Sequence, residues 1–350
     1  MPPMDARRPT RTLIRDWRTL TTASPKARDA DRATLIACSA GSDSSALAIA
    51  LASRRTATTL VLAHIIHDLR PAAQGRADRD SARDLAAALS LPFVERSVNV
   101  TEREGNAEAH ARSARYAALA DLARDCACPF VATAHHADDQ LESILLALTR
   151  GAGPRGLAGI APARPLAPGI TLIRPALALR QSDLAAICAA ASHTPAHDAT
   201  NADISRARAY VRAEVLPALT KRFPHAPSRA ADASRALWDA HAAIRDQARD
   251  LVASARVQAP PAERRLTRTT IAAAPDAVAT EAIRLTLHAV GTRPDRISAR
   301  TTRSILTAIR AEQDRHRTFT LARSTLRVSA HDIHARPSDQ AANAKDTNNA

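Results

Sequence analysis

The stretch that decides the fold is Thr34-Leu-Ile-Ala-Cys38, followed at once by Ser39-Ala-Gly-Ser-Asp-Ser-Ser45. The first part reads as a short buried strand, and the small polar residues after it fit a turn into a helix over 44–53. The same rhythm continues along the chain. Further strands are expected at Thr59–His64, Phe93–Val98, Phe130–Thr133 and Ile170–Ile173, and helices over 77–89, 107–126 and 138–149. Strands that alternate with helices of this length form parallel βαβ units, so the predicted fold class is α/β, a Rossmann-like parallel sheet flanked by helices.

The turn after the first strand has the properties of a phosphate-binding loop. Small residues let backbone N–H groups approach a phosphate, and the start of the following helix adds partial positive charge. A carboxylate at Asp43 would help to hold the Mg²⁺ that accompanies nucleotide phosphates. An ordinary strand-to-helix turn with a serine cap stays open as the alternative. The candidate nucleotide-binding residues are Ser39, Ala40, Gly41, Ser42, Asp43 and Ser44.

A second polar cluster, His135-His-Ala-Asp-Asp-Gln-Leu-Glu142, follows the fourth expected strand. With a helix that starts near Asp138, the side chains of Asp138 and Glu142 lie one turn apart on one face. Asp138 and Asp139 occupy the first turn, where the helix dipole stabilises carboxylates. Three acids so close together can coordinate Mg²⁺ or hold an ammonium group, and a simple helix-capping cluster is the alternative.

Composition and charge narrow the function classes. A formal net charge of +14 favours a polyanionic partner such as nucleic acid, although a solvated basic surface would give the same number. Aromatic residues make up 2% of the chain, which argues against a stacking platform for single strands. The cysteines Cys38, Cys126, Cys128 and Cys188 fit neither a disulfide framework nor a paired zinc motif. No apolar run reaches membrane-spanning length, so we expect a cytoplasmic protein without a membrane partner.

The chain is expected to divide into four parts. Residues 1–30 are predicted to be a flexible arm with at most one short helix, and residues 31–220 the α/β domain. Residues 225–335 are predicted to form a smaller, mainly helical domain that ends in a hairpin of Thr318–Ala322 and Thr325–Val328, and residues 336–350 a disordered tail. The glycine-rich segment 151–159 should be a loop, and Ser182 should cap a helix that runs to Ala191.

The first motif resembles the S-G-G-x-D-S PP-loop of the N-type ATP pyrophosphatases, which cleave ATP between the α- and β-phosphates. Ala40 stands where that family has its first glycine, and an alanine would strain a left-handed backbone there. The second motif, together with Arg150-Gly151 and Arg155–Gly159, resembles the H-H-x-D-D-Q-x-E…R-G…R-G-L-x-G signature of the tRNA(Ile)-lysidine synthetases.

Three further segments resemble the same family and follow its order. They are His64–Arg70 with Asp68 in place of a glycine, the helix from Gly105-Asn-Ala-Glu108 through Arg112 and Arg115-Tyr116, and the segment with Asp198, Asn201, Asp203, Arg208, Arg212 and Pro217, in which Ala209 replaces an asparagine. Arg112 and Arg115 lie one helical turn apart and could bind a phosphate together. The resemblance is strong over residues 32–220 and weak over 225–335.

The resemblance implies an ATP-dependent ligase. It would adenylate the wobble cytidine of an isoleucine tRNA with a CAU anticodon, and the ε-amine of L-lysine would then displace AMP to leave lysidine. Asp43 and Asp139 would hold Mg²⁺, Arg112 and Arg208 would join them as catalytic residues facing phosphate or the adenylated base, and Asp138 and Glu142 would hold the lysine ammonium group. A homodimer is compatible with the sequence.

Two other functions stay open. One is a PP-loop enzyme for tRNA thiolation, although such relatives usually need paired cysteines, and Cys126 and Cys128 are too close to serve. The other is a basic RNA-binding protein with an inactive PP-loop domain, which the departures at Ala40, Asp68 and Ala209 keep open.

Overall fold

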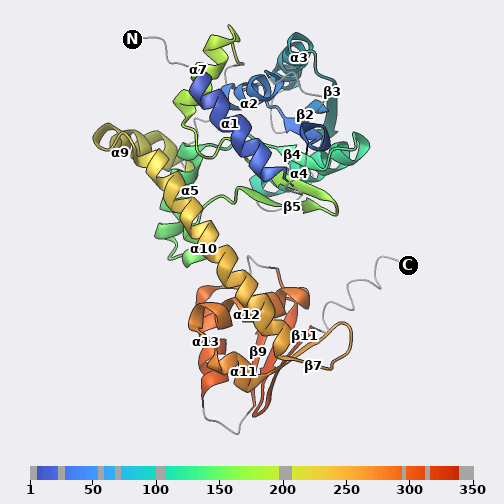
Figure 1. Ribbon diagram of the computed structural model, residues 1–350, viewed down its shortest axis with the longest axis vertical. Coiled ribbons are helices and arrows are strands. Elements are labelled where there is room, and N and C mark those ends of the chain that lie inside the picture. The colour runs from blue at the N-terminus through green and yellow to red at the C-terminus, as the bar shows by residue number, and fades with distance from the viewer. Residues whose placement is uncertain are drawn as a thin grey trace. The chain divides into compact units, whose positions relative to one another are not determined.

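The computed structural model describes residues 6–22, 28–53, 59–67, 72–99, 107–196, 207–293, 297–311 and 316–338. The chain divides into two compact units (Figure 1). The first consists of Met1–Gly151 and Gly156–Arg235, and the second of Ala152–Arg155 and Ala236–Ala350. This division falls within the long helix α10 (Ala226–Ser254), about ten residues after the boundary that we expected from the sequence.

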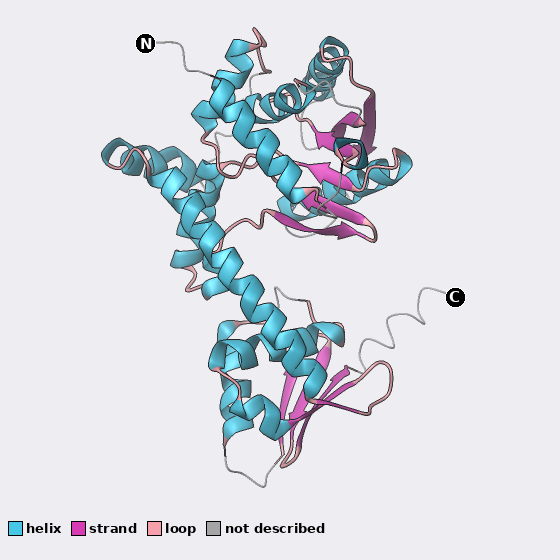
Figure 2. Cartoon of the chain, viewed as in Figure 1, coloured by secondary structure: helices cyan, strands magenta, loops and turns pink. Residues whose placement is uncertain are grey.

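A six-stranded sheet forms the centre of the first unit, in the order β3-β2-β1-β4-β6-β5 (Figure 2). Neighbouring strands are parallel except for β5, which runs antiparallel to β6. The predicted fold class is therefore confirmed. The strands are β1 (Thr34–Ala37), β2 (Leu60–His67), β3 (Phe93–Val98), β4 (Phe130–Ala132), β5 (Ala163–Ala167) and β6 (Ile170–Ile173). We did not predict β5, whose polar and proline-containing sequence lacks a strand pattern.

Helices cover both faces of this sheet and bury its alternating side chains. Leu35 of β1 packs into one core with Leu119 of α4 (Ala107–Asp125), and Ile36 packs into the other with Leu47 of α2 (Ser42–Ala52). Successive residues of a strand point to opposite faces, so a fully apolar strand needs helices on both sides. The first unit also contains α3 (Ala72–Ala88), α5 (Ala137–Thr149) and α7 (Gln181–Ala190).

Residues 1–30 were predicted to form a flexible arm with at most one short helix. In the structure Arg7–Leu20 form helix α1, which is part of the folded first unit. Leu13 and Trp17 are 0% and 2% exposed and belong to the core on the α2 side of the sheet. The indole nitrogen of Trp17 also donates to Thr34 Oγ1 at 3.1 Å, at the start of β1. The many arginines hid the apolar stripe of α1, whose residues Pro9, Leu13 and Trp17 recur every fourth position.

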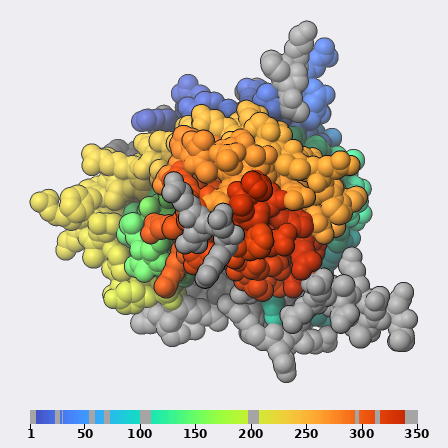
Figure 3. Space-filling model, turned by 90° about the horizontal axis from the view of Figure 1, so that it is seen from below, coloured from blue at the N-terminus to red at the C-terminus, as the bar shows by residue number. Residues whose placement is uncertain are grey.

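The second unit contains a five-stranded antiparallel sheet in the order β7-β8-β11-β10-β9. The expected hairpin is present as β9 (Arg317–Leu321) and β10 (Ser324–Val328), with Phe319 opposite Leu326. We missed β7 (Arg256–Val257), β8 (Arg264–Thr267) and β11 (Asp332–Pro337), which are short and rich in charged residues. Helices α11 (Arg268–Ala273), α12 (Asp276–Ala289) and α13 (Ala299–Arg310) share one apolar core with this sheet. Figure 3 shows the orange and red residues of this unit packed together.

Several local expectations also need correction. One turn of helix, α6 (Pro154–Leu157), lies inside the segment expected to be a loop. Helix α7 begins one residue before Ser182, and the residue that caps it is Arg180, whose N–H donates to Asp183 Oδ2 at 2.8 Å. Arg336 and Pro337 of the expected tail belong to β11, and residues 339–350 lie outside the described residues. Among the described residues, no helix is long and apolar enough to cross a membrane.

Candidate active site

The loop after β1 and the start of α2 form the first part of the site. Gly41 is the N-cap of α2, and the helix begins at Ser42. Ala40 has a φ of 65°, so the left-handed backbone that we expected to be strained by an alanine is present. This conformation costs an L-residue about 1–2 kcal/mol. Its carbonyl accepts a hydrogen bond from the N–H of Ala196 at 3.0 Å, which helps to hold the loop.

Ser44 organises the inside of this loop. Its hydroxyl donates to the carbonyl of Gly41 at 3.0 Å and accepts from the N–H of Ser39 at 3.1 Å. The hydroxyl of Ser39 lies 3.2 Å away from the same atom. The first backbone N–H groups of any helix lack intrahelical acceptors, and here they follow this folded loop. The arrangement suits an anion such as a nucleotide phosphate.

His136 joins the loop to the second motif. Its Nε2 lies 3.5 Å from Asp43 Oδ2 and 3.6 Å from Asp139 Oδ2, and its Nδ1 lies 3.4 Å from Asp138 Oδ2. Burial opposes a charge on this ring, but contacts with Asp138 and Asp43 and the charge of Asp139 raise the pKa of His136 to about 10. These contacts favour the protonated form of the ring, which lies between three carboxylates.

Glu142 and Asp139 form an ion-pair cluster with two arginines. Glu142 is 1% exposed, and its two carboxylate oxygens accept from Arg208 Nε at 2.9 Å and from Arg212 Nε at 2.5 Å. Asp139 Oδ1 accepts from Arg212 Nη2 at 2.8 Å and lies 3.4 Å from Arg208 Nη2. The arginines lie on α8 (Ala207–Tyr210) and on the π-helical turn Val211–Val215 that follows it, four residues apart. A π-helical turn often marks a functional position.

Asp138 has different partners from Glu142. Its Oδ2 accepts from the backbone N–H of Gln181 at 2.9 Å, at the start of α7. Burial opposes its charge, but the hydrogen bonds from His136 and Gln181 lower the pKa of Asp138. The joint binding of an ammonium group by Asp138 and Glu142 stays a prediction, and both oxygens of Glu142 are engaged by arginines in this structure.

Arg112 lies in a cluster around Tyr116, and its predicted role toward phosphate or the adenylated base stays a prediction. Its Nη2 donates to the hydroxyl of Tyr116 at 3.2 Å, and the guanidinium of Arg164 lies 4.8 Å from the centre of the same ring. Burial raises the pKa of the Tyr116 phenol, but the charges of Arg112 and Arg174 outweigh it and lower that pKa. Arg174 is 4% exposed, and its Nη1 donates to the carbonyl of Ala161 at 2.5 Å.

Four residues of these clusters were not among the site residues that we predicted. Arg212 was named only as a motif position, and His136 only as part of the His135–Glu142 motif. Arg164 and Arg174 carried no signal, because nothing separates them from the other arginines of an arginine-rich chain. The four-residue spacing of Arg208 and Arg212 could have identified Arg212, since it places both guanidinium groups on one helix face.

Part of the predicted site cannot be placed. Asp68, Gly105, Asn106, Asp198, Asn201 and Asp203 lie outside the described residues, and so do the side chains of His67 and Glu108. His135 is described and accepts or donates one hydrogen bond with Thr133 Oγ1 at 3.1 Å. Burial and the charge of Arg174 lower the pKa of His135, which keeps the ring neutral at pH 7.

The donor set around His136 fits a magnesium ion with bound phosphates. Within the described ranges, no group of three His, Cys, Asp or Glu side chains is arranged to hold a metal ion alone. In nucleotide sites, however, Mg²⁺ usually takes only one or two protein carboxylates and completes its shell with phosphate and water. Asp43 and Asp139 both face the same atom, His136 Nε2, beside the phosphate-binding loop. They are the two carboxylates that would hold the ion, and Asp139 would do so beside the hydrogen bonds that it accepts from Arg212 and from the N–H of His136.

Curated relatives match about half of the chain. The sequence is similar to the tRNA(Ile)-lysidine synthase of Salinispora tropica, with 46% identity over 191 residues that make up 53% of this chain and 56% of that relative. It is 42% identical over 194 residues to the tRNA(Ile)-lysidine synthase of Symbiobacterium thermophilum, which covers 54% of this chain and 40% of that relative. The chain thus spans about half the length of the curated relatives that it matches.

A solved structure and a family model complete the comparison. The structure is the U34-tRNA thiolase NcsA from Methanococcus maripaludis with its 4Fe–4S cluster, which superposes with a TM-score of 0.53 over 66% of this chain and 80% of that chain. At 14% identity this likeness concerns the fold alone. The model of the PP-loop domain matches residues 13–219, which include most of α1, the phosphate-binding loop and the cluster of Asp139 with Arg208 and Arg212. Because this match covers more than half of the chain, the protein belongs to the PP-loop domain family, a membership that implies the use of ATP.

Proposed function

We propose that this protein is an ATP-dependent ligase that converts the wobble cytidine of an isoleucine tRNA with a CAU anticodon into lysidine. The observation that carries the proposal is the convergence of Asp43 and Asp139 on His136, directly beside a phosphate-binding loop. The similarity to curated tRNA(Ile)-lysidine synthases over about half the chain supports the choice of substrate. ATP, Mg²⁺ and L-lysine are the proposed cofactor, metal and co-substrate.

The first step forms an adenylated tRNA. The C2 carbonyl oxygen of the cytidine attacks the α-phosphorus of ATP, a P–O bond forms, and pyrophosphate leaves. The loop of residues Ser39–Ser44 and the start of α2 bind the phosphates with backbone N–H groups. Asp43 and Asp139 would hold Mg²⁺, which supplies charge neutralisation for the leaving pyrophosphate.

Two sets of basic groups assist this step. The protonated ring of His136 keeps Asp43, Asp138 and Asp139 oriented through its contacts at 3.4–3.6 Å. Arg208 and Arg212 lie on the other side of Asp139, so they fix its carboxylate and present positive charge beside it. Arg112 would contribute through the cluster around Tyr116, where it can meet a phosphate or the adenylated base.

In the second step the ε-ammonium group of lysine gives a proton to solvent, and the resulting amine attacks C2. The C2–O bond breaks, AMP leaves, and the new C2–N bond completes lysidine as the nitrogen releases its second proton to solvent. We propose Asp138 as the carboxylate that binds the lysine ammonium group, because its side chain is 22% exposed and lies at the first turn of α5. Glu142 would join it only if Arg208 or Arg212 moved away. A substrate that adds its own charges to this cluster could cause such an exchange.

The thiolation alternative finds no support in the cysteines. Burial raises the pKa of Cys128 and of Cys188 to about 11, and it also raises the pKa of Cys38 and Cys126. A thiol with a raised pKa is a poor nucleophile at neutral pH. An RNA-binding protein without activity is the other alternative, and Ala40 and Ala209 are the described residues that keep it open.

The remaining proposals concern the rest of the chain. Residues 31–220 would carry the ATP chemistry, and residues 225–335 would contribute contacts to the tRNA. The protein is proposed to act in the cytoplasm, and a homodimer stays compatible with the sequence.

The test is the incorporation of labelled lysine into RNA. Purified protein is incubated with ATP, Mg²⁺, labelled lysine and an isoleucine tRNA transcript with a CAU anticodon, and a methionine tRNA with the same anticodon is the control. Label confined to the isoleucine tRNA is the expected result. AMP without label would point to another nucleophile, and neither product would favour the inactive RNA-binding relative.

A further inference from the structure

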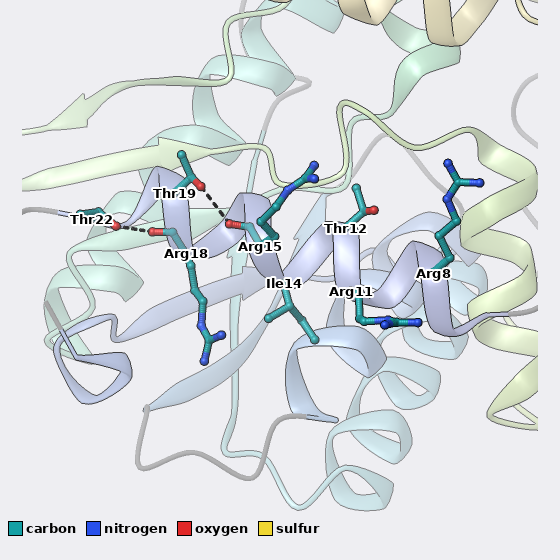
Figure 4. A pocket seen from close by; sticks show the side chains of 8 residues that line it. All are labelled: Arg8, Arg11, Thr12, Ile14, Arg15, Arg18, Thr19 and Thr22. Atoms are coloured by element: carbon teal, nitrogen blue, oxygen red, sulfur yellow. Dashed lines mark hydrogen bonds between the residues drawn. The ribbon is translucent and has the colours of Figure 1, made fainter. Parts of the chain in front are cut away.

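Helix α1 carries an arginine stripe on the face opposite its buried side. Arg8, Arg11, Arg15 and Arg18 follow each other at intervals of three or four residues, and at 3.6 residues per turn they fall within an arc of about 80°. Leu13 and Trp17 point the other way into the core. Figure 4 shows these arginines along the helix, lining a shallow open hollow with Thr12 and Thr19.

Two arginines of this stripe lack an acidic partner among the described residues. Asp16 is the one acidic residue of α1, and it pairs with Arg15 at 2.9 Å. Arg8 and Arg11 make no ion pair with a carboxylate in the part of the chain that the structure describes. Helix α3 of the same unit differs, because its Arg79 and Arg83 pair with Asp80 and Glu95 at 2.7 and 2.9 Å.

Helix stability does not explain the start of the stripe. The start of a helix carries partial positive charge, so acidic residues are favoured there and basic residues are not. The first turn of α1 has no acidic residue and contains Arg8, whereas Arg18 lies in the last turn, where the helix dipole favours a cation. Arg8 therefore occupies a position that a helix needing only solubility would fill differently, which favours an external anionic partner at this end of the stripe.

We infer that the arginine stripe, Arg8, Arg11, Arg15 and Arg18, binds the phosphate backbone of RNA. Ten residues of helix separate the first arginine from the last, which corresponds to about 15 Å, enough for several phosphates. Guanidinium groups match phosphate oxygens with paired hydrogen bonds. The inference rests on the proposed function only for the identity of the RNA, a tRNA.

An anionic membrane fits the stripe less well than RNA does. Helices that bind membranes insert an exposed apolar face between the lipid headgroups. The apolar face of α1 is already used, because Leu13 and Trp17 are 0% and 2% exposed within the core. A surface that offers arginines alone is suited to phosphate contacts in water.

The test compares two variants that lose equal charge. One is R8Q/R11Q/R15Q in α1, and the matched control is R76Q/R79Q/R83Q in α3, both in the full chain and both checked for folding by circular dichroism. The dissociation constant for an unmodified isoleucine tRNA transcript is measured without ATP or lysine, between about 50 and 200 mM salt. Binding alone is read out, so this measurement does not depend on whether the protein makes lysidine.

The α1 variant should bind the tRNA about 10- to 100-fold more weakly at low salt. Its log–log salt dependence should be shallower by about 0.7–0.9 for each phosphate that the variant no longer neutralises, so by about 2 in all. The α3 control should change affinity by less than about threefold, since Arg79 and Arg83 are already paired with carboxylates.

Several outcomes would overturn the inference. They are unchanged tRNA binding by the α1 variant, equal losses in both variants, and phosphatidylserine vesicles bound by the wild type but not by the α1 variant while tRNA binding is unchanged. If lysine incorporation fails in all three proteins while the α1 variant alone loses tRNA affinity, the proposed function is wrong and the RNA-binding surface stands.

Discussion

Asp139 in the first unit and Asp332 in the second are both buried aspartates that pair with arginine, and both are 7% exposed. The carboxylate of Asp332 accepts hydrogen bonds from Arg265 and from the hydroxyl of Ser329. The backbone N–H of Asp332 donates to the same hydroxyl oxygen at 3.0 Å. Asp139 lies instead among further charges, with His136, Glu142 and two arginines in contact or close by.

The two aspartates differ in what surrounds them. One arginine and one turn hydroxyl donate to the carboxylate of Asp332, and the neighbouring Ile333 and Ala335 belong to an apolar core. Asp139 also has a structural role, because its carboxylate accepts from the N–H of His136 in the capping box of α5. It differs from Asp332 in lying among several further carboxylates and cations, beside the loop that precedes α2. Clusters of titratable groups with shifted pKa values are typical of active sites, so we expect Asp139 and not Asp332 to act in catalysis.

The largest expected effect is on catalysis at Asp139. Asp139→Asn keeps the shape of the side chain but removes the charge that faces His136 and the arginines, so tRNA-dependent formation of AMP should fall about 100- to 1000-fold. Binding of the tRNA should stay near normal. The matched control is Asp332→Asn, whose AMP formation per folded molecule should equal that of the wild type. Full activity in Asp139→Asn would remove this residue from the catalytic site.

The next effect concerns the apolar core of the second unit. Leu326 of β10 is 0% exposed, and Leu326→Ala should lower the free energy of unfolding of that unit by about 2–5 kcal/mol through lost burial and a cavity. Denaturant titration followed by circular dichroism measures this. Nucleotide affinity, measured by calorimetry, should not change, because the phosphate-binding loop belongs to the first unit. A parallel loss of nucleotide affinity would show that the stability of the second unit affects nucleotide binding by the first.

A smaller effect is expected at Asp332, and it should depend on pH. Burial opposes its charge, but the hydrogen bond from Ser329 and the ion pair with Arg265 lower the pKa of Asp332 below the ordinary 3.8. A carboxyl with a lowered pKa stabilises the fold above its unfolded value, and that contribution is lost as the pH falls through the folded value. Asp332→Asn should therefore cost about 1–2 kcal/mol at neutral pH, because Arg265 is half exposed and partly screened.

The measurement for Asp332 is unfolding by urea at a series of pH values. The difference in the free energy of unfolding between Asp332→Asn and the wild type should become smaller as the pH falls below 3.8. Asp246, which is 70% exposed and pairs with Arg249 at 2.9 Å, gives the matched control. Asp246→Asn should change stability by less than about 0.5 kcal/mol. If the difference in the free energy of unfolding between Asp332→Asn and the wild type stayed constant with pH, the charge of Asp332 would not be what stabilises the turn.

The smallest effect is expected in the phosphate-binding loop. Ala40→Gly relieves a left-handed backbone worth about 1–2 kcal/mol but removes one buried methyl group worth about 0.8 kcal/mol, so the net gain in stability should be under about 1 kcal/mol. Ala127, with a φ of 52° in the turn after α4, is the control. Both glycine variants should melt at a slightly higher temperature, and only Ala40→Gly should change the affinity for ATP. A loss of stability in Ala40→Gly alone would show that its buried methyl group outweighs the strain, since Ala127 is exposed.

Much of the first unit could be predicted because its strands are short apolar runs between helices. Phe93–Val98 and Ile170–Ile173 have the predicted bounds, and β1 and β4 differ from prediction by one residue. Strand β5 could not be predicted, because it is stabilised by pairing with β6 and not by its own pattern. The same holds for β8 and β11, which are charged strands that only their partners make recognisable.

The sequence by itself determined the α/β fold class, the loop after β1 with Ala40 in a left-handed conformation, and the presence of several acids after β4. These features depend on residues close together in the chain, where spacing dictates geometry. Only the tertiary structure decided that His136 lies between Asp43 and Asp139, that Arg212 shares Glu142 with Arg208, and that α1 packs on the core with its arginine stripe outward. Those contacts join residues up to roughly a hundred positions apart, and packing rather than local pattern selects among so many arginines.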